Sequence, residues 1–129
     1  MIPSASLLNA IGLSGIDFAI IDAEHGPVGM ETAEHLVRAA DVTNIAPIIR
    51  VPSNDSHLIL RALDIGAHGV QVPHVSTKEE AQRVVQSSKY HPRGNRGFTP
   101  FTRAGKYGID AEGHPQRANE STMVVVNVE

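Results

Sequence analysis

The sequence predicts an α/β fold: a partial (β/α)8 TIM barrel of about four consecutive βα units. Short apolar runs alternate with amphipathic stretches, which indicates parallel strands buried on both faces and joined by helices. Polar residues follow successive apolar runs where each strand would end, the edge at which barrel enzymes assemble their active sites. No Gly-rich fingerprint follows a strand, so a nucleotide-binding open sheet and a nucleotide cofactor are not expected.

The first half of the chain predicts two helix-strand pairs. Residues 3–13 form a helical pattern, and residues 18–21 are a continuous apolar run that ends in the polar segment 22–27. Apolar residues three or four apart predict a second helix over residues 30–40. Residues 46–51 then read as the second strand.

Another helix-strand pair follows. Ser53 and Asn54 offer N-caps for a helix through residues 58–63, and Gly66 supplies its stop. Residues 69–72 predict a strand that ends at Pro73 and His74.

The last part of the chain holds the final predicted strand. Thr77 and Glu80 form a capping box for the next helix. A polar excursion rich in Gly and Pro runs over residues 89–121, and a long excursion after a strand-helix pair is typical of an active-site loop. Residues 123–129 close the chain as a β-branched strand.

The strand count is half of what a closed barrel requires, since such a barrel has eight strands and usually about 250 residues. We therefore expect residues 1–129 to be one partial barrel domain, truncated at both ends. An open half-barrel leaves unpaired edges and an uncovered apolar face. For the 129 residues alone, we expect poor solubility or self-association, and no turnover.

Composition excludes several classes of function. A net charge of −3 without a dense basic run argues against nucleic acid as a partner. The absence of Cys excludes disulfides, thiolate metal sites and cysteine nucleophiles. Without a signal-peptide pattern or an apolar run of about 20 residues, we expect a cytoplasmic protein with no membrane contact.

Three residues at strand ends are candidates for chemistry. His25 has Asp22 and Glu24 close by, as a general base requires, although a loop histidine without a task is equally compatible with the spacing. Arg50 is either a clamp for a carboxylate or an exposed strand end. Glu129 could bind a hard divalent cation, but the sequence alone favours an exposed terminal residue.

The remaining residues narrow the reaction class. The only lysines, Lys78, Lys89 and Lys106, do not lie at strand ends, so a Schiff-base mechanism is unsupported. Neither a nucleophile elbow nor a Walker-type loop is present. Acid, base, arginine and metal chemistry remain, which favours proton transfer next to a carbonyl.

Five motifs together resemble the HpcH/HpaI family of class II, metal-dependent pyruvate aldolases, within the phosphoenolpyruvate/pyruvate-type barrel superfamily. They occur in order along most of the chain, at residues 22–26 (DAEHG), 49–52 (IRVP), 62–70 (ALDIGAHGV), 72–75 (VPHV) and 89–97 (KYHPRGNRG). The resemblance implies reversible aldol cleavage of a 4-hydroxy-2-oxo acid to pyruvate and an aldehyde. It further implies a divalent cation (Mg, Mn or Co) and a homo-oligomeric full-length parent.

The resemblance also implies roles for individual residues. His25 matches the histidine that shuttles the proton, Arg50 the arginine that binds pyruvate and its enolate, and Glu129 a metal ligand. Asp22 and Glu24 match supporting carboxylates around the histidine.

Two positions depart from the family pattern. Asn127 stands where the family usually has a substrate-binding Gln, and the family's second metal ligand, an Asp, would lie beyond Glu129. Gln71 and Pro73 lie on the same rim without an assigned role.

Two alternatives stay open. One is a non-catalytic half-barrel fragment that survives by oligomerising, so that a neighbour covers its open edges. The other is a citrate-lyase-type carbon–carbon lyase, which a basic pocket for coenzyme A would distinguish; no such pocket is visible in the sequence.

Overall fold

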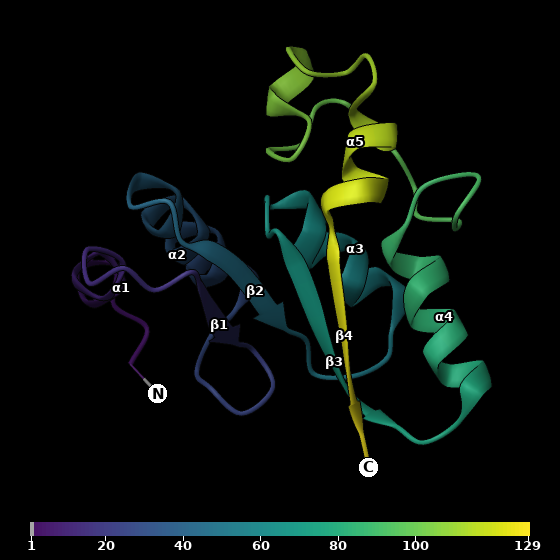
Figure 1. The fold of residues 1–129 in the computed structure, drawn as a ribbon, viewed down its shortest axis with the longest axis horizontal. Helices are drawn as coiled ribbons and strands as arrows, with labels where there is room; N and C mark the ends of the chain where they lie inside the picture. Colours follow the sequence, from purple (N-terminus) through teal and green to yellow (C-terminus); the bar gives the residue numbers. More distant parts are fainter. Residues whose placement is uncertain (1) are drawn as a thin grey trace.

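The computed structural model describes residues 2–129 and contains a four-stranded parallel sheet in the order β1-β2-β3-β4 (Figure 1). Helices lie between successive strands, which confirms the predicted partial barrel. The elements follow one another as α1 (Ala5–Gly12), β1 (Phe18–Asp22), α2 (Met30–Val42), β2 (Ala46–Arg50), α3 (Ser56–Asp64), β3 (Gly69–Val75), α4 (Lys78–Ser88), the 3-10 turn η1 (Lys106–Gly108), α5 (His114–Ser121) and β4 (Met123–Val128).

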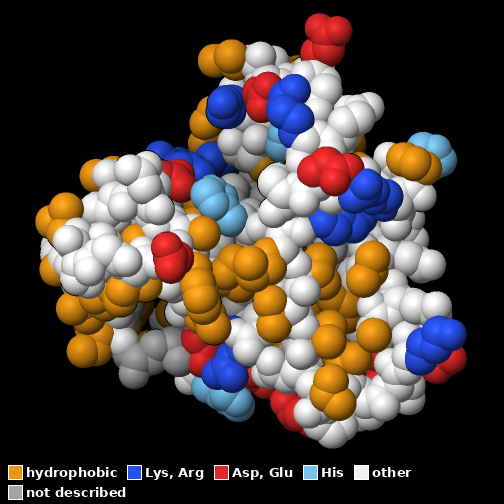
Figure 2. All heavy atoms as spheres, viewed as in Figure 1, with side chains coloured by type: hydrophobic (Ala, Val, Ile, Leu, Met, Phe, Trp, Pro, Cys, Tyr) orange, Lys and Arg blue, Asp and Glu red, His pale blue; other side chains and the backbone are white. Residues whose placement is uncertain are grey.

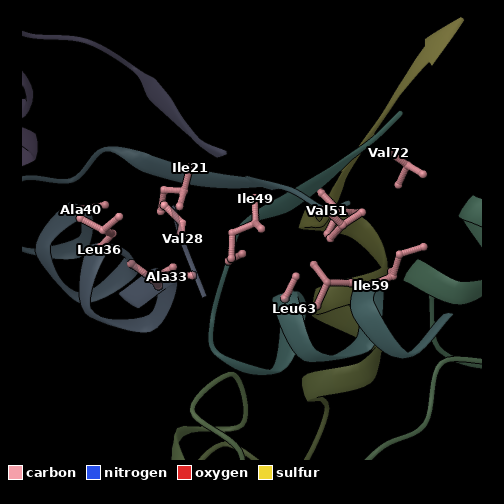
Figure 3. Close-up of a cluster of buried hydrophobic side chains, with 14 of the residues drawn as sticks. Ile21, Val28, Ala33, Leu36, Ala40, Ile49, Val51, Ile59, Leu63 and Val72 are labelled. Atoms are coloured by element: carbon pink, nitrogen blue, oxygen red, sulfur yellow. The ribbon is translucent and has the colours of Figure 1, made fainter. Parts of the chain in front are cut away.

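One face of the sheet, here called the outer face, forms the hydrophobic core with the helices (Figure 3). Strand side chains alternate between the two faces of a sheet. Ile21, Ile49, Val70 and Val72 lie on the outer face and are buried. They belong to one apolar cluster with helix side chains that include Leu36, Val37, Ile59, Leu63 and Val84.

The opposite face of the sheet, here called the inner face, is apolar, and its side chains at the two edges are exposed to solvent in the structure of residues 2–129. Ile20 is in register with Ile48, and the strands continue this row through Gly69 to Met123. Ile20 is 49% exposed and Met123 is 51% exposed, whereas Ile48 in the middle of the row is buried. Figure 2 shows hydrophobic side chains gathered over the sheet on this side of the molecule.

The helix caps follow the sequence with one correction. Asp55, and not Ser53 or Asn54, caps α3, because its carboxylate accepts the backbone N–H groups of His57 at 2.8 Å and of Leu58 at 3.1 Å. A carboxylate at this position also stabilises the helix dipole, which a neutral cap does less well. The capping box ahead of α4 is present as predicted.

The excursion of residues 89–121 contains η1 and α5, two elements that the sequence did not predict. Tertiary hydrogen bonds hold α5 in place: the Asn119 side chain accepts the N–H of Tyr90 at 2.7 Å and donates to the Tyr90 carbonyl at 3.0 Å. The Lys89 ammonium donates to the carbonyls of Asn119 and Thr122 at 2.9 and 2.6 Å. None of the helices over residues 2–129 is both long and apolar enough to cross a membrane.

Candidate active site

Charged side chains from different strands converge at the carboxyl end of the sheet. In the parallel register Asp22 is level with Arg50, and Arg50 is level with Gln71. β1 and β2 end at Asp22 and Arg50, whereas β3 continues to Val75. We call this set the rim cluster; it consists of Asp22, Glu24, His25, Arg50, His74 and Glu129.

Asp22 and Arg50 form the rigid centre of the rim cluster. The Arg50 Nε donates to Asp22 Oδ1 at 2.9 Å, and its Nη2 donates to Oδ2. Asp22 Oδ1 also accepts the backbone N–H groups of Glu24 at 2.9 Å and His25 at 3.2 Å. The hydrogen bond from Arg50 is the main cause that lowers the pKa of the buried Asp22 carboxyl to about 2. The carboxylate is therefore ionised near neutral pH, and it fixes both the Arg50 fork and the turn after β1.

Glu24 connects the ion pair to two histidines. Its side chain is only 8% exposed, and its Oε2 lies 3.3 Å from Arg50 Nε. Its Oε1 lies 3.5 Å from His25 Nε2 and 3.2 Å from His74 Nε2. One nearly buried carboxylate thus faces a guanidinium and two imidazoles that are themselves exposed to solvent.

His25 lies beyond the strand end with its imidazole largely in solvent. Glu24 is the carboxylate next to this imidazole, whereas the Asp22 carboxylate contacts the backbone N–H of His25. Asp22 therefore positions the histidine through the main chain. A carboxylate beside an exposed imidazole is an arrangement that suits proton transfer.

His74 is a rim residue to which sequence reasoning gave no role. Its Nδ1 lies 2.7 Å from Glu129 Oε2, so the ring bridges Glu129 and Glu24. β3 runs to Val75 instead of ending near Val72, and its pairing with β4 is irregular between Val72 and Val75. His74 has a φ of +56°, a left-handed conformation that re-aims its side chain toward the rim. The only signal in the sequence was a histidine at a strand end.

Gln71 and Asn127 form an amide pair beside the ion pair. The Gln71 Nε2 donates to Asn127 Oδ1 at 2.7 Å, which joins β3 to β4 at the level of the rim. Gln71 Oε1 is buried and has no hydrogen-bond partner among the described residues. An acceptor in this state calls for a donor from solvent or from a ligand.

Metal ligands are too few at this edge. Within residues 2–129, no group of three or more His, Asp or Glu side chains is arranged to hold a metal ion. Asp22 and Glu24 are both engaged with Arg50, which leaves Glu129, whose half-exposed carboxylate contacts His74 but not Arg50, as the hard oxygen donor nearest to being available. A hard cation takes about six oxygen ligands. The described residues thus offer the type of oxygen ligand that a hard cation prefers, but too few of them to form a complete metal site.

A larger cavity lies at the other end of the sheet. Its volume is about 780 Å³, and it is lined by residues that precede β3 and β4 and by the excursion of residues 89–121. Three Arg–Asp ion pairs occur around it: Arg96–Asp64, Arg103–Asp41 and Arg117–Asp110. This cavity is separate from the rim cluster, and the arginines of these three pairs are already engaged with carboxylates.

Comparison with known proteins identifies relatives along the full described chain. A family model described as HpcH/HpaI aldolase/citrate lyase matches residues 2–129. A 2-dehydro-3,6-dideoxy-6-sulfogluconate aldolase from Pseudomonas putida is 40% identical over 129 residues, which are all of this chain and 50% of the relative. A 5-keto-4-deoxy-D-glucarate aldolase from Escherichia coli O139:H28 is 37% identical over 92% of this chain and 46% of its own length. The chain therefore spans about half the length of these curated relatives.

Solved structures give the same result. A protein from Burkholderia cenocepacia J2315, described as an HpcH/HpaI aldolase/citrate lyase family protein, superposes with a TM-score of 0.90 at 30% identity. The match covers 97% of this chain and 51% of that one. The citrate synthase SbnG superposes with a TM-score of 0.83 at 38% identity, over 97% of this chain and 47% of its own.

Proposed function

Because this chain belongs to the HpcH/HpaI aldolase/citrate lyase family, we propose that its rim cluster binds a 2-oxo acid and supports reversible aldol cleavage of a 4-hydroxy-2-oxo acid to pyruvate and an aldehyde. The observation that carries the proposal is the ion pair of Arg50 with Asp22. Beside it, the Glu24 carboxylate lies between Arg50 and the imidazole of His25. The names of the two aldolase relatives contain keto-deoxy sugar acids, which belong to the same class of substrate as a 4-hydroxy-2-oxo acid.

Arg50 is proposed to bind the substrate carboxylate and the enolate. A planar guanidinium presents several N–H donors in fixed directions, which suits both oxyanions. Asp22 holds this fork in one orientation, so little side-chain entropy is lost when the ligand binds.

His25 is proposed to move the proton of the C4 hydroxyl. In the cleavage direction the imidazole takes this proton, the C3–C4 bond breaks, and its electron pair passes toward the 2-oxo group to form the enolate. The aldehyde leaves, and protonation of the enolate at C3 gives pyruvate. The Glu24 carboxylate, with Oε1 3.5 Å from His25 Nε2, lies beside the ring that carries this proton.

A divalent cation (Mg, Mn or Co) is proposed as the cofactor, with Glu129 as one of its ligands. Asp22, Glu24 and Glu129 carry three negative charges against the one positive charge of Arg50, which leaves two negative charges when the histidines are neutral. An anionic 2-oxo acid would be repelled by this cluster without a cation. When bound, the cation would supply Lewis-acid polarisation of the substrate carbonyl. Asn127 is proposed to contact the substrate next to this ligand.

The proposal can be tested in a chimera in which residues 2–129 replace the matching half of the Pseudomonas putida aldolase. We expect the chimera to release pyruvate from a 4-hydroxy-2-oxo acid, and His25→Ala to remove that release while the chimera stays folded. His35→Ala is the matched control, because His35 is exposed on α2 and away from the rim. Equal loss in both variants, or full activity in His25→Ala, would contradict the role of His25.

A second candidate follows from the similarity to the citrate synthase SbnG. It is carbon–carbon bond formation or cleavage on a citrate-type acid. The same chimera separates the candidates, because release of pyruvate from 4-hydroxy-2-oxo acids supports the aldolase. Turnover of citrate-type acids alone would support the second candidate.

A further inference from the structure

The large cavity at the amino end of the sheet is walled by internal segments of the chain. Its volume is about 780 Å³, and its lining lies between residues 38 and 122. The wall comes from α2, the end of α3, the excursion and α5. α5 faces the cavity with one side, because its lining residues His114, Arg117 and Ser121 are three and four positions apart.

The lining carries more cations than carboxylates. Lysine and arginine supply five of its side chains, against two carboxylates, those of Asp41 and Asp110. Figure 2 shows several Lys, Arg and His side chains over the excursion and α5, at this end of the molecule. The five cations of the lining are Arg38, Arg96, Arg103, Lys106 and Arg117.

Ion pairs neutralise the four arginines but not Lys106. Arg38 pairs with Glu34 and Arg96 with Asp64, two carboxylates outside the lining, while Arg103 and Arg117 pair with the two carboxylates of the lining itself. Lys106 is exposed and has no ion-pair partner among residues 2–129. With neutral histidines, five cations against four carboxylates leave one positive charge here, in a chain whose net charge is −3.

The arginines of the lining are only partly engaged. In all four pairs the carboxylate contacts the guanidinium through Nη2. Arg38 and Arg117 make their side-chain hydrogen bonds to other described residues through this one nitrogen, so their Nε and Nη1 donors are free within residues 2–129. Both side chains are about half exposed, so a ligand can reach them. A phosphate group accepts several such donors at once.

Two further polar atoms of the wall are buried without a partner. They are Arg96 Nε and His114 Nε2, each without a hydrogen bond to the described residues. The His114 ring stacks on Phe98 with ring centres 6.0 Å apart, and burial is the main cause that lowers its pKa, so the ring is neutral near pH 7. Buried polar atoms are rarely left unpaired in proteins. Because both atoms are shielded, the exposed donors make the first contacts with a ligand, and these two gain a partner when the wall shifts around it.

A left-handed turn carries the unpaired cation of the lining. Lys106 and Tyr107 have φ values of +49° and +55°, a conformation that is unfavourable for residues with a Cβ. The Tyr107 hydroxyl accepts a hydrogen bond from Arg38 Nη2 at 3.4 Å, which links the turn to α2. Strained backbone of this kind clusters at ligand sites, where surrounding contacts hold it in place. The turn thus keeps the Lys106 ammonium on the same wall as the arginines.

We propose that this cavity binds a small molecule that carries a phosphate group, at a site distinct from the rim cluster. The exposed donors of Arg38, Lys106 and Arg117 contact the phosphate oxygens. The positive charge that remains on the wall attracts the anion. The volume lies within the range of about 300–1,000 Å³ that is typical of pockets for small organic ligands, so the organic part fits beside the phosphate. The inference does not depend on the proposed activity.

Phosphate suits this cavity better than the carboxylate of a 2-oxo acid does. A phosphate monoester carries a charge of about −1.5 to −2 near pH 7 and three acceptor oxygens, whereas a carboxylate has one charge and two oxygens. Three separate cationic side chains match the larger charge and the larger number of oxygens. We therefore expect pyruvate to be a poor competitor at the cavity.

Calorimetric titration of the chain measures the binding. Glycerol 3-phosphate should bind at one site per chain, more tightly than inorganic phosphate, and an excess of pyruvate should not displace it. Lys106→Gln should weaken this binding about tenfold, because one charge-assisted contact is lost. Lys78→Gln is the matched control, since Lys78 is exposed at the start of α4 and outside the lining.

Three results of this titration would overturn the proposal. They are the absence of binding, an affinity for inorganic phosphate equal to that for glycerol 3-phosphate, and an unchanged affinity in Lys106→Gln. Because Lys106 is exposed and has no ion pair among the described residues, its substitution tests the site without disturbing the fold.

The place of binding is the second test. In the isotope-labelled chain, glycerol 3-phosphate should shift the amides around Lys106 and Arg117 and leave those of Asp22, His25 and Arg50 in place. Shifts centred on the rim would overturn the proposal. The chimera described above should show the same single site, because the whole lining lies within residues 38–122. A folded chimera that binds no glycerol 3-phosphate would equally overturn it.

Discussion

Both ends of the sheet carry charges, but the charges are arranged differently. At the carboxyl end, the single carboxylate of Glu24 faces groups from separate segments: Arg50, His25 and His74. At the amino end, the arginines around the large cavity each contact a different carboxylate, in the pairs Arg96–Asp64, Arg103–Asp41 and Arg117–Asp110. His68 and His114 lie 3.9 and 4.0 Å from Asp41 and Asp110.

This difference in charge arrangement suggests that the amino-end pairs stabilise the fold, whereas the rim cluster binds a ligand. Two of the pairs at the amino end tie the excursion to helices: Arg96 to Asp64 at the end of α3, and Arg103 to Asp41 in α2. Within each of these pairs the charges balance, although Arg96 Nε and His114 Nε2 are buried around the cavity without a hydrogen-bond partner among the described residues. The rim cluster keeps an excess of negative charge, and beside it Gln71 Oε1 is an acceptor without a partner among the described residues. Changes at the rim should therefore alter binding of a 2-oxo acid, and changes in the amino-end pairs should alter stability without altering that binding.

The largest expected effect is that of Arg50→Met. The substitution leaves the buried Asp22 carboxylate without its partner, which we expect to lower the free energy of unfolding by about 3 kcal/mol. Binding of a 2-oxo acid should be lost as well. Denaturant unfolding and ligand titration measure the two effects. Arg38→Met, which breaks an exposed pair with Glu34 on α2, is the control and should change neither.

Arg96→Met should give a smaller effect of a different kind. The buried Arg96 guanidinium pairs with Asp64 at 2.6 Å and lies 4.5 Å from the centre of the Tyr90 ring. Loss of both contacts should lower the free energy of unfolding by about 2 kcal/mol. Ligand affinity at the rim should stay unchanged in the folded fraction. A weakened affinity in this variant would break the distinction between the two ends.

Acid should destabilise the chain through Asp22. The pKa of its carboxyl is lowered from 3.8 to about 2 in the folded state, so the folded state binds this proton less readily than the unfolded state. The stabilisation is complete above about pH 4 and is lost as pH falls toward 2, a change of up to about 2 kcal/mol. Unfolding measured across this range in Asp22→Asn should lack this component. An identical pH profile in the variant would show that other carboxyl groups cause the effect.

The smallest expected effect is that of Arg117→Ala. Arg117 is about half exposed and pairs with Asp110 at the surface of the excursion, so the free energy of unfolding should change by less than about 1 kcal/mol. Thermal unfolding of the variant measures this. A loss as large as that of Arg96→Met would mean that the exposed pairs also hold the excursion in place.

The order of elements and much of the rim followed from the sequence. Apolar runs separated by helical patterns predicted parallel strands, and parallel strands in register bring Asp22 level with Arg50. These features depend on periodicity and on the ends of strands, which are local properties. The proposed roles of His25, Asn127 and Glu129 came from the family resemblance and stay predictions.

What the sequence did not predict depends on contacts between distant segments. α5 has a weakly apolar pattern, and it is held by hydrogen bonds between Asn119 and Tyr90, 29 residues away. The role of His74 depends on a left-handed backbone and on an irregular pairing with β4. The choice of Asp55 over two neighbouring polar residues as the cap of α3 depended on the local geometry of one turn.

The most direct test of the rim as the ligand site is a magnetic-resonance titration of the isotope-labelled chain with pyruvate and Mg²⁺. Amide shifts should concentrate at the carboxyl end of the sheet, over Asp22 to His25, Arg50, His74 and Glu129. Amides around Arg96, Arg103 and Arg117 should stay in place and serve as the internal control. Shifts centred on the cavity at the amino end, or none at the rim at saturating ligand, would contradict the assignment.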